Sequence, residues 1–495
     1  MGSDLQFTVS QVQVEGLSSV KPERIAPVWA GYIGQSINVA QLCRLRDAVA
    51  AALLNENILT RVEIPEQQIT DGVVRLEVIE AQIESVTVEG DIGKVRSHLE
   101  KVLAPLTRMP FIDLDVAQRY LLLATDTPGI VIQPVLMPGT SRGGLILRVR
   151  AERSAVSGLA SIQNLNSVAQ GRAMAFARLD LNSFTALGER TTLIAATSSD
   201  FEEQRIFQLI EEIRLNADGL VARASATLGL GSPGGDIAAL DLGTRSIVGN
   251  LELAYPVMRH RRHNLSLAGG VDLINQRTRV FDSLLLSTER ARIAYARISG
   301  DVSNSNNQLP ASFTGSLELR QGMGVLEASS RGSPLMTRPF ANPEAFVVRG
   351  AFNGSVSPIP QATLAVAGIA QYSASPLMAY EQFGIGNLTI GRGYDPNSYP
   401  ADRGVAVSTE IQLTPFQYAR RGFLSPFVFT DVARVDTLGP QGGDRTLMSI
   451  GGGARFRVLD KLSGSVTYAH PLDTLQPGGP SSPDRLLVSL STHFR

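Results

Sequence analysis

The hydrophobic and polar positions of this chain follow two different patterns, which meet near residue 155. Before that point, short alternating segments are separated by stretches with helical spacing, such as Leu42, Leu45 and Val49. After it, apolar and polar residues alternate with a period of two up to the C-terminus, as in residues 405–413. Because helices repeat every 3.6 residues and strands every two, the patterns predict an α+β region followed by an all-β region.

The first region contains a weak internal duplication. The sequence VQVEG at residues 12–16 recurs as VTVEG at residues 86–90. Each copy continues with two helical patterns and two further alternating segments, which predicts a small β-α-α-β-β domain. We expect one domain at residues 6–80 and a second at 81–152. Predicted elements are strands at 58–64, 73–79, 130–136 and 145–149, and a helix at 113–124 capped by Asp113.

The second region, residues 155–495, predicts a long series of strands, each with one apolar and one polar, often charged face. A soluble sandwich would bury the apolar face against a second sheet, whereas a transmembrane barrel turns that face to lipid and its polar face to the lumen. The number of strands is even, as bacterial barrels require. The sixteen strands are expected near residues 156, 171, 188, 203, 219, 246, 264, 287, 309, 345, 360, 404, 422, 447, 461 and 485.

The lengths of the predicted connections favour the barrel. Outer-membrane barrels have short periplasmic turns and longer outside loops. Connections after odd-numbered strands tend to be long, and the longest, 372–403, is expected to fold inward. The α+β region enters the first strand from the short-turn side, which predicts a periplasmic position. Long connections include 232–245 and 323–344, and short ones 184–187, 200–202, 258–263 and 357–359.

Composition excludes several classes of protein. Charged residues make up 18% of the chain and the net charge is −1, so nothing favours a nucleic-acid partner. No apolar run approaches the 18 residues of a membrane-spanning helix. The lone cysteine, Cys43, allows no intramolecular disulfide. Residues 1–5 are interpreted as a cloning scar and short tail, without a signal peptide.

A basic residue in the long loop and an acidic residue in a strand are the strongest candidate pair. Arg392 lies between Gly391 and Gly393, and Asp431 lies within the alternating segment 429–433. Arginine can grip a carboxylate with two parallel hydrogen bonds, and small neighbours would let the loop backbone reach the barrel wall. From position alone, a lumenal salt bridge and two residues that never meet are equally compatible with the sequence.

No catalytic, cofactor or metal site is predicted. The chain contains no GxSxG, HExxH, P-loop or CxxC motif. A GxGxxG pattern at 229–234 is followed by a strand rather than the helix that a dinucleotide site needs. His260 and His263 flank two arginines in a short turn, and a metal site would need further ligands there.

The whole chain from about residue 6 resembles the outer-membrane transporters of two-partner secretion, the TpsB family. The two N-terminal repeats resemble the POTRA domains of that family. The loop tip Gly391-Arg392-Gly393-Tyr394 is similar to the family's V-R-G-Y/F motif, with Gly in place of Val. The segment from Phe429 to Ala433 resembles F-x-D-x-G, with Ala in place of the final Gly. Weaker similarities lie at residues 64–72, 126–129 and 255–259.

The resemblance implies a gating pair and a function. Arg392 and Asp431 would hold the loop inside the barrel, with Glu410 on a neighbouring strand as a second partner of the arginine. The family implies a Gram-negative outer-membrane protein that exports a large β-rich exoprotein. The alternatives are an insertase of the same superfamily, a passive pore for small solutes, and an enzyme on a barrel anchor, for which no constellation of residues speaks.

The expected partners are the exoprotein, outer-membrane lipid, periplasmic chaperones and the barrel-assembly machinery. That machinery recognises an amphipathic last strand, such as the one that ends at Phe494. The unfolded exoprotein would pair with the edge strands 58–64 and 130–136, because an unpaired edge can bind an extended peptide. The alternative for both strands is ordinary packing within a domain. The residues named for this contact are Ile58, Ile64, Ile130, Ile132 and Leu136.

Overall fold

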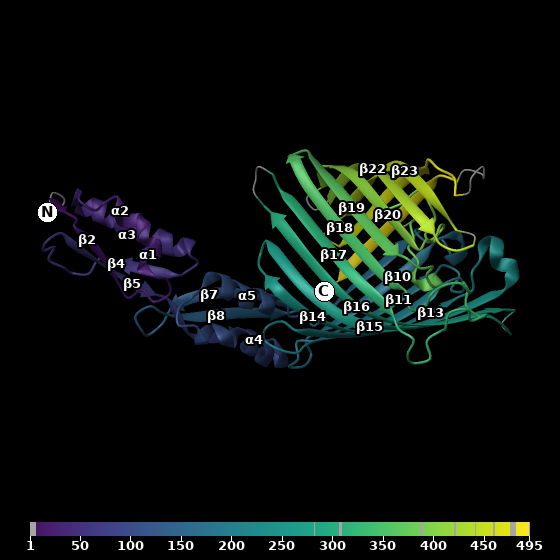
Figure 1. Cartoon of the computed structure of the whole chain (residues 1–495), viewed down its shortest axis with the longest axis horizontal. Helices are drawn as coiled ribbons and strands as arrows, with labels where there is room; N and C mark the ends of the chain where they lie inside the picture. The colour runs from purple at the N-terminus through teal and green to yellow at the C-terminus, as the bar shows by residue number, and fades with distance from the viewer. Residues whose placement is uncertain are drawn as a thin grey trace. The chain divides into compact units, whose positions relative to one another are not determined.

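The computed structural model describes residues 6–281, 283–305, 309–386, 390–419, 422–440, 442–458, 461–475 and 482–494. The tail expected at residues 1–5 lies outside the described residues. The chain divides into two compact units (Figure 1). One contains Met1–Arg153 with the short segments Ser183–Gly188 and Asn216–Asp218, and the other contains the remainder up to Arg495.

The first α+β domain folds as its hydrophobic pattern predicts. In its sheet, of order β2-β5-β4, β2 is parallel and β4 antiparallel to the central strand. The long helix begins with a capping box between Asn38 and Gln41, and its face Leu45, Val49 and Leu53 is buried in the core. The elements are β1 (Gln6–Thr8), β2 (Gln11–Glu15), α1 (Pro22–Ile25), α2 (Pro27–Ala30), β3 (Ser36–Asn38), α3 (Val39–Asn55), β4 (Thr60–Glu63) and β5 (Val73–Glu80).

The second α+β domain repeats this order. Its sheet has the order β6-β8-β7, again with one parallel and one antiparallel pair. Asp113 caps the second helix as predicted, because its carboxylate accepts hydrogen bonds from the backbone N–H groups of Asp115 and Val116. The elements are β6 (Gln82–Glu89), η1 (Gly93–Val95), α4 (Arg96–Leu103), η2 (Ala104–Arg108), α5 (Leu114–Thr125), β7 (Ile130–Pro138) and β8 (Gly144–Arg153).

The second unit is a closed antiparallel barrel, which confirms the predicted fold class. Among the described residues, β20 and the short β21 both pair with β22, so they form one stave of a sixteen-stave barrel. The first half comprises β9 (Val156–Gln163), β10 (Met174–Asn182), β11 (Arg190–Ser198), β12 (Arg205–Arg214), β13 (Val221–Gly231), β14 (Leu242–Arg259), β15 (His263–Val280) and β16 (Leu284–Asn304).

The second half begins with β17 and carries the longest loops. It comprises β17 (Ala311–Gly322), β18 (Phe346–Ile359), β19 (Ala362–Ser373), β20 (Arg403–Leu413), β21 (Phe416–Ala419), β22 (Gly422–Thr437), β23 (Gly443–Val458), β24 (Leu462–Pro471) and β25 (Arg485–Phe494). Two short helical turns interrupt loops on the long-loop side, η4 (Gly235–Leu240) and η5 (Ala379–Glu381), and a third, η3 (Val168–Gln170), follows β9.

The connections separate into two rims, with one correction to the sequence reading. The segment 200–202, grouped above with the even-strand turns, joins β11 to β12 and therefore follows the third strand. It lies on the long-loop rim although it is short. The loop between β19 and β20 covers residues 374–402, close to the predicted 372–403.

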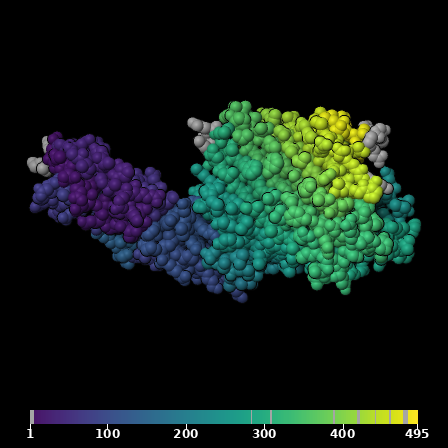
Figure 2. Space-filling view, viewed as in Figure 1, coloured from purple at the N-terminus to yellow at the C-terminus, as the bar shows by residue number. Residues whose placement is uncertain are grey.

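The two faces of the barrel strands differ as the alternation predicts. On β14, Leu251 and Leu253 are 56% and 53% exposed on the outer face, whereas Glu252 between them is 6% exposed and faces the lumen. An apolar outer band is what lipid requires, since it cannot hydrogen-bond to polar groups. Figure 2 shows the outer surface of the later strands in green and yellow. No helix in the described part of the chain is long and apolar enough to cross a membrane.

Candidate functional site

The loop between β19 and β20 enters the lumen and places Arg392 against the barrel wall. Arg392 is 3% exposed, and Asp431 on β22 is 1% exposed. Nε of Arg392 lies 3.1 Å from Oδ2 of Asp431 and Nη2 lies 2.9 Å from Oδ1. The backbone N–H of Arg392 also donates to Oδ2, at 2.9 Å. Arg392 and Asp431 therefore form a bidentate ion pair, and a hydrogen bond from the backbone of Arg392 strengthens it.

The same guanidinium has two further partners on β20. Nη1 donates to Oε2 of Glu410 at 2.8 Å, and Nη2 donates to the hydroxyl of Ser408 at 2.8 Å. Ser408 lies directly opposite Asp431 in the strand register. Sequence reasoning named Glu410 but missed Ser408, although the period-two alternation places both on the same face. The donors of Arg392 are thus shared among two carboxylates and one hydroxyl.

An aromatic ring completes the seat of the arginine. The guanidinium carbon of Arg392 lies 3.3 Å from the ring centroid of Phe429, a cation–π arrangement. The ring fits because β23 carries Gly451 beside it, where an added Cβ would stand 2.6 Å from the ring. Phe429, predicted only as a motif residue, thus forms the surface on which Arg392 lies.

The loop tip needs small residues for two different reasons. Gly391 has φ +76°, a left-handed conformation that costs a residue with a Cβ about 1–3 kcal/mol. Gly393 has an ordinary φ, but a Cβ there would approach Cβ of Ser449 to 2.6 Å. Its backbone N–H lies 3.3 Å from the Ser449 hydroxyl oxygen. Glycine at 391 in place of the family's valine therefore suits the backbone, and glycine at 393 lets the loop touch the wall.

Tyr394 and Ala433 belong to an apolar cluster that attaches the loop to the wall. Tyr394 is 1% exposed, and its hydroxyl lies 2.8 Å from the carbonyl oxygen of Met448 and 3.1 Å from that of Asp473. Ala433 is buried in the same cluster. The methyl group that replaces the family's glycine there is accommodated by packing. The other buried members are Phe383, Ile385, Ile390, Ala401, Ala406, Val435 and Leu447.

The last strand also reaches the loop, which no sequence pattern indicated. Arg485 on β25 is 5% exposed, and its Nη1 donates to the carbonyl oxygens of Arg392 and Tyr394. Its Nε lies 3.3 Å from a carboxylate oxygen of Asp395. The loop also contacts Ser449 on β23 and Pro471 on β24, so its path along the lumenal wall brings it to Arg485 on the next strand.

A second missed contact ties three outside loops together. Asp402 is fully buried, and its two oxygens lie 2.5 and 2.9 Å from Nη1 and Nη2 of Arg338. The backbone N–H groups of Leu377 and Leu438 also donate to it, at 2.8 and 2.6 Å. The base of the inward loop is therefore bound to the loops after β17 and β22.

A polar hollow of about 330 Å³ adjoins the arginine on the short-turn side of the lumen. Arg392, Ser408 and Glu410 form part of its wall. Glu410 also holds Arg455, whose Nη1 lies 2.6 Å from Oε1. The anchor thus stands where the loop-filled part of the lumen meets open polar space, so release of the arginine would join the two.

The expected partner-binding strands lie at sheet edges, but several of their named side chains do not face outward. Ile58 and Ile130 are each 5% exposed. Ile130 belongs to the core of the second α+β domain, whereas Ile58 precedes β4 and forms an isolated bridge with Asp113. Ile64 and Ile132 pack against the cores of their own domains. Leu136 is 48% exposed, so it is the one named side chain that a partner could readily touch.

In addition, neither edge strand is fully available to pair with a partner. At the β4 edge, the N–H of Leu59 donates to the carbonyl of Ile112 in the second α+β domain, at 3.1 Å, so this end is occupied. On β7, Pro134 and Pro138 lack an N–H group and reduce what the edge can offer. The β7 hairpin tip is fixed by Glu84, whose pKa falls to about 2 because it accepts a hydrogen bond from the Ser141 hydroxyl.

The residues considered for a metal site form none. His260 and His263 stack with ring centroids 4.4 Å apart in the turn after β14. In the described ranges, no group of three or more His, Cys, Asp or Glu side chains could hold a metal ion. The charged groups of the lumen instead pair with one another.

The comparisons with known proteins agree on one family. A model described as haemolysin secretion/activation protein ShlB/FhaC/HecB matches residues 145–456, and a model of the POTRA domain, ShlB-type, matches residues 7–81. Two outer membrane transporters CdiB, from Escherichia coli and from its strain 536 / UPEC, are 22% and 24% identical over 200 and 204 residues. Each alignment covers 39% of this chain and 33% of the relative, so it spans about a third of the relatives' length.

Solved structures share the fold over the full chain. CdiB from Escherichia coli has a TM-score of 0.81 at 17% identity, covering 99% of this chain and 91% of its own. CdiB from Acinetobacter baumannii has a TM-score of 0.71 at 15% identity, covering 100% and 91%. BamA from Haemophilus ducreyi lacking POTRA domains 1–3 has a TM-score of 0.57 at 12% identity, covering 99% and 100%. At these identities the likeness establishes the fold alone.

Proposed function

Because the chain belongs to the ShlB/FhaC/HecB family of haemolysin secretion/activation proteins, we propose that it exports one large, β-rich exoprotein by two-partner secretion. The protein is an outer-membrane barrel, and in this family the POTRA domains lie in the periplasm. The barrel is the conduit, and the POTRA domains receive the partner in an unfolded state. Its relatives are transporters rather than enzymes.

One observation carries this proposal, the seat of Arg392 inside the lumen. A loop that only covers a static pore needs no buried ion pair to the barrel wall. A loop that must stay in the lumen in the closed state and leave it during transport benefits from one strong, localised contact. Arg392 and its two carboxylate partners, Asp431 and Glu410, are each at most 6% exposed. Breaking such a pair is costly because it leaves an uncompensated buried charge, so the closed state is well defined. We expect an arriving partner to supply the competing interactions.

Recognition by the POTRA domains rests on the β7 edge rather than on β4. Val131 and Val135 are 58% and 46% exposed on β7, and Leu136 adds a third apolar side chain. An extended apolar segment of the partner could pair with this edge and cover these side chains. The prolines limit the pairing to short stretches, which suits a contact that must be released during transport.

An insertase that places other barrels in the membrane is the alternative from the same superfamily, and the BamA likeness supports it only at the level of fold. The family match favours export, since it covers most of the barrel and the first POTRA domain. A passive pore for small solutes would explain neither the POTRA domains nor the buried anchor.

Secretion of the partner tests the proposal. A large β-helical protein encoded beside this chain would be the partner to test. Its amount outside the cell is compared among cells with wild type, Arg392→Ala, Asp431→Ala or no barrel. We expect export to vanish without the barrel and to fall in both point variants while barrel levels, followed by heat-modifiable gel migration, stay constant.

Two results would redirect the interpretation. Export that is untouched by deletion would exclude a secretion transporter for that partner, and loss of other outer-membrane barrels in the deletion strain would then favour the insertase. Export that depends on the barrel but not on Arg392 or Asp431 would keep the transporter and reject the gating role of the pair.

A further inference from the structure

A belt of alternating charges runs around the inner wall of the barrel from β11 to β17. Each acid pairs with at least two arginines, from neighbouring strands, from strands nearby or, for Glu318 and Arg320, from the same strand. Arg223 Nη2 is 2.7 Å from Glu212 and its Nη1 is 2.6 Å from Glu252. Arg297 then joins Glu252 to Glu318, the latter at 3.2 Å. Taken in chain order, the charge belt consists of Arg190, Glu212, Arg223, Glu252, Arg297, Glu318 and Arg320.

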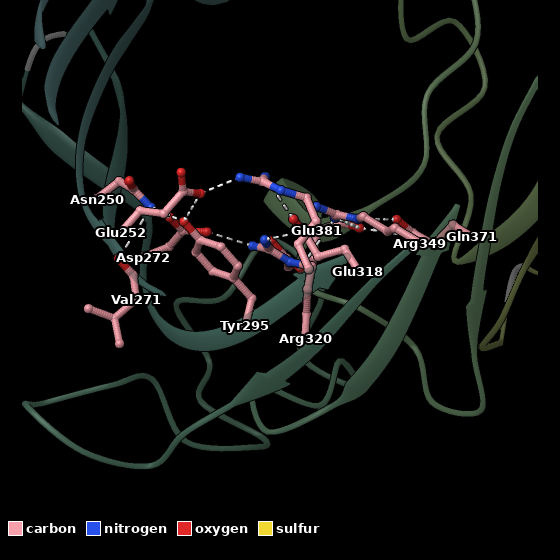
Figure 3. Close-up of polar contacts among 11 residues, drawn as sticks. Asn250, Glu252, Val271, Asp272, Tyr295, Glu318, Arg320, Arg349, Gln371 and Glu381 are labelled. Carbon is pink, nitrogen blue, oxygen red and sulfur yellow. Dashed lines mark hydrogen bonds and ion pairs between the residues drawn. The ribbon is translucent and has the colours of Figure 1, made fainter. Parts of the chain in front are cut away.

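The next acid along this belt comes from the inward loop and not from the wall. Glu381, in η5, is 6% exposed and accepts two hydrogen bonds from Arg320 on β17, at 2.9 and 3.0 Å. Its carboxylate also lies 3.2 Å from Nη2 of Arg349 on β18. Figure 3 shows Glu381 with Arg320, Arg349 and Glu318 around it, and Glu252 and Asp272 to the left.

The main chain of the loop is held at the same point. The carbonyl oxygen of Glu381 accepts from Arg349 Nη2 at 3.0 Å and from the Gln371 amide at 2.9 Å. Gln371 is 5% exposed on β19, and its oxygen in turn accepts from Nε of Arg349 at 2.7 Å. Both the side chain and the backbone of one loop residue are thus bound to three consecutive wall strands.

The two arginines depend on Glu381 to different degrees. Arg320 keeps two wall carboxylates, Asp272 and Glu318, each at 2.9 Å. For Arg349, the described residues contain no ion pair other than the one to Glu381. Glu318 lies directly opposite Arg349 in the register, so it stands ready to receive that arginine when Glu381 leaves. The contact of Glu381 with the two arginines can therefore break and re-form without leaving either arginine far from a carboxylate.

From these contacts we infer that Glu381 is a second anchor of the inward loop, of opposite sign to Arg392. The loop presents a cation to wall acids on β20 and β22, and, eleven positions earlier, an anion to wall arginines on β17 and β18. The two contacts cannot be exchanged, because either swap would place like charges together. Opposite anchors therefore set both the position and the direction of the closed loop. This inference rests on the proposed function, in which the loop must move.

Ile385 offers a direct readout, because it lies between the anchors and is 1% exposed. In a Cys43→Ser background, which removes the lone native thiol, Ile385→Cys reacts with a membrane-impermeant maleimide only when the loop leaves the lumen. The labelling rate of the purified full-length protein is measured with no further change, with Glu381→Gln, with Arg392→Gln, and with both. Unheated gel migration verifies a folded barrel in every case.

Glu381→Gln is expected to raise the labelling rate about tenfold, since it removes charge-assisted hydrogen bonds to two arginines. If the two anchors act independently, the fold-changes of Glu381→Gln and Arg392→Gln multiply in the double variant. Glu252→Gln is the matched control. It removes an equally buried acid from the charge belt without touching the loop, and labelling should stay near wild type.

Equal effects of Glu381→Gln and Glu252→Gln would overturn the inference, because the belt would then act on the barrel as a whole. Unchanged labelling in Glu381→Gln would overturn it as well. Should that variant not fold, Arg349→Gln tests the same contact from the wall and must raise labelling. These results concern loop position in purified protein, so failure of the second anchor is distinguishable from failure of the export proposal, which the deletion strain decides.

Discussion

Arg392 makes contacts both along the edge of its guanidinium group and on its face, which explains why one residue can hold a loop. Its planar guanidinium bonds to Asp431 and Glu410 and lies flat on Phe429. A lysine in its place would keep the charge but lose the two-pronged geometry and the stacked face. The partners are unequal, because Asp431 accepts three hydrogen bonds from this residue and Glu410 accepts one.

This inequality predicts graded effects on gating. Asp431→Asn should raise the open probability of the purified channel about 100-fold, because buried Arg392 then keeps one carboxylate, Glu410, which Arg455 also holds. Glu410→Gln should raise it only about tenfold, since one charge-assisted bond is lost. Single-channel conductance in planar bilayers measures both. Equal effects of the two substitutions would show that the contacts do not carry the difference assigned to them.

Gly391 gives a second prediction, which runs against the family pattern. Gly391→Val should raise the open probability about tenfold, because a β-branched residue at φ +76° is strained. Gly391→Asn is the control, because Asn tolerates this φ although its Cβ still approaches the Gly386 nitrogen, 2.9 Å from an ideal Cβ. A wild-type conductance trace for Gly391→Val would mean that the loop backbone differs from the one described.

At the scale of elements, the seam between the first and last strands has the fewest residue pairs of any two neighbouring staves in the described part of the barrel. Six residue pairs join β9 to β25, whereas eighteen join β15 to β16. Beyond the last pair, Asn164 continues the seam. Its side-chain oxygen accepts from the N–H of Val488 at 2.6 Å and its amide donates to the carbonyl of Leu486 at 2.8 Å. The side chain of Asn164 thus makes two hydrogen bonds to β25 like those of a further pair of strand residues.

We therefore expect amide hydrogens of β9 and β25 to exchange faster than those of β15 and β16. Asn164→Ala should speed exchange at Val488 about tenfold, because two hydrogen bonds are lost. Hydrogen exchange followed by mass spectrometry of the protein in micelles gives both values. Asn166→Ala, in the same connection but bonded to Gln204 rather than to β25, should leave the seam unchanged. Uniform exchange around the barrel would contradict this account of the seam.

At the scale of the whole molecule, the proposed export needs a source of direction. The chain lacks a P-loop, and charge is balanced within the lumen by the belt and the two loop anchors. Folding of the partner on the outer side can supply direction, because a folded segment cannot return through the lumen. The barrel then needs only to open and to avoid binding the passing chain tightly.

Export of partner already in the periplasm should accordingly continue after an uncoupler collapses the proton-motive force. The measurement is a pulse-chase of secreted partner with the uncoupler added after loading, and a blocked inner-membrane export substrate serves as the control for energy depletion. Immediate arrest of release at the outer membrane would reject outward folding as the driving process.

The fold could be read from the sequence to a large extent, because its determinants are local. Alternation with a period of two places each barrel residue toward lipid or lumen, and it predicted sixteen strands, while the lengths of the connections predicted the two rims. The N-cap Asp113 and the face Leu45, Val49 and Leu53 defined helices in the same way. The loop-tip arginine and the strand acid could be named because each is unusual for its own local setting.

Tertiary structure decided which of these residues meet. Ser408 and Asp431 are neighbours only through strand register, and Arg485 meets the loop only through the path of the loop along the wall. Glu381 reads in sequence as an ordinary loop acid, and its place between two arginines follows from the path of the loop through the lumen. Side-chain direction is set by a residue's own strand, but a partner is set by the register and closure of strands far apart in the chain.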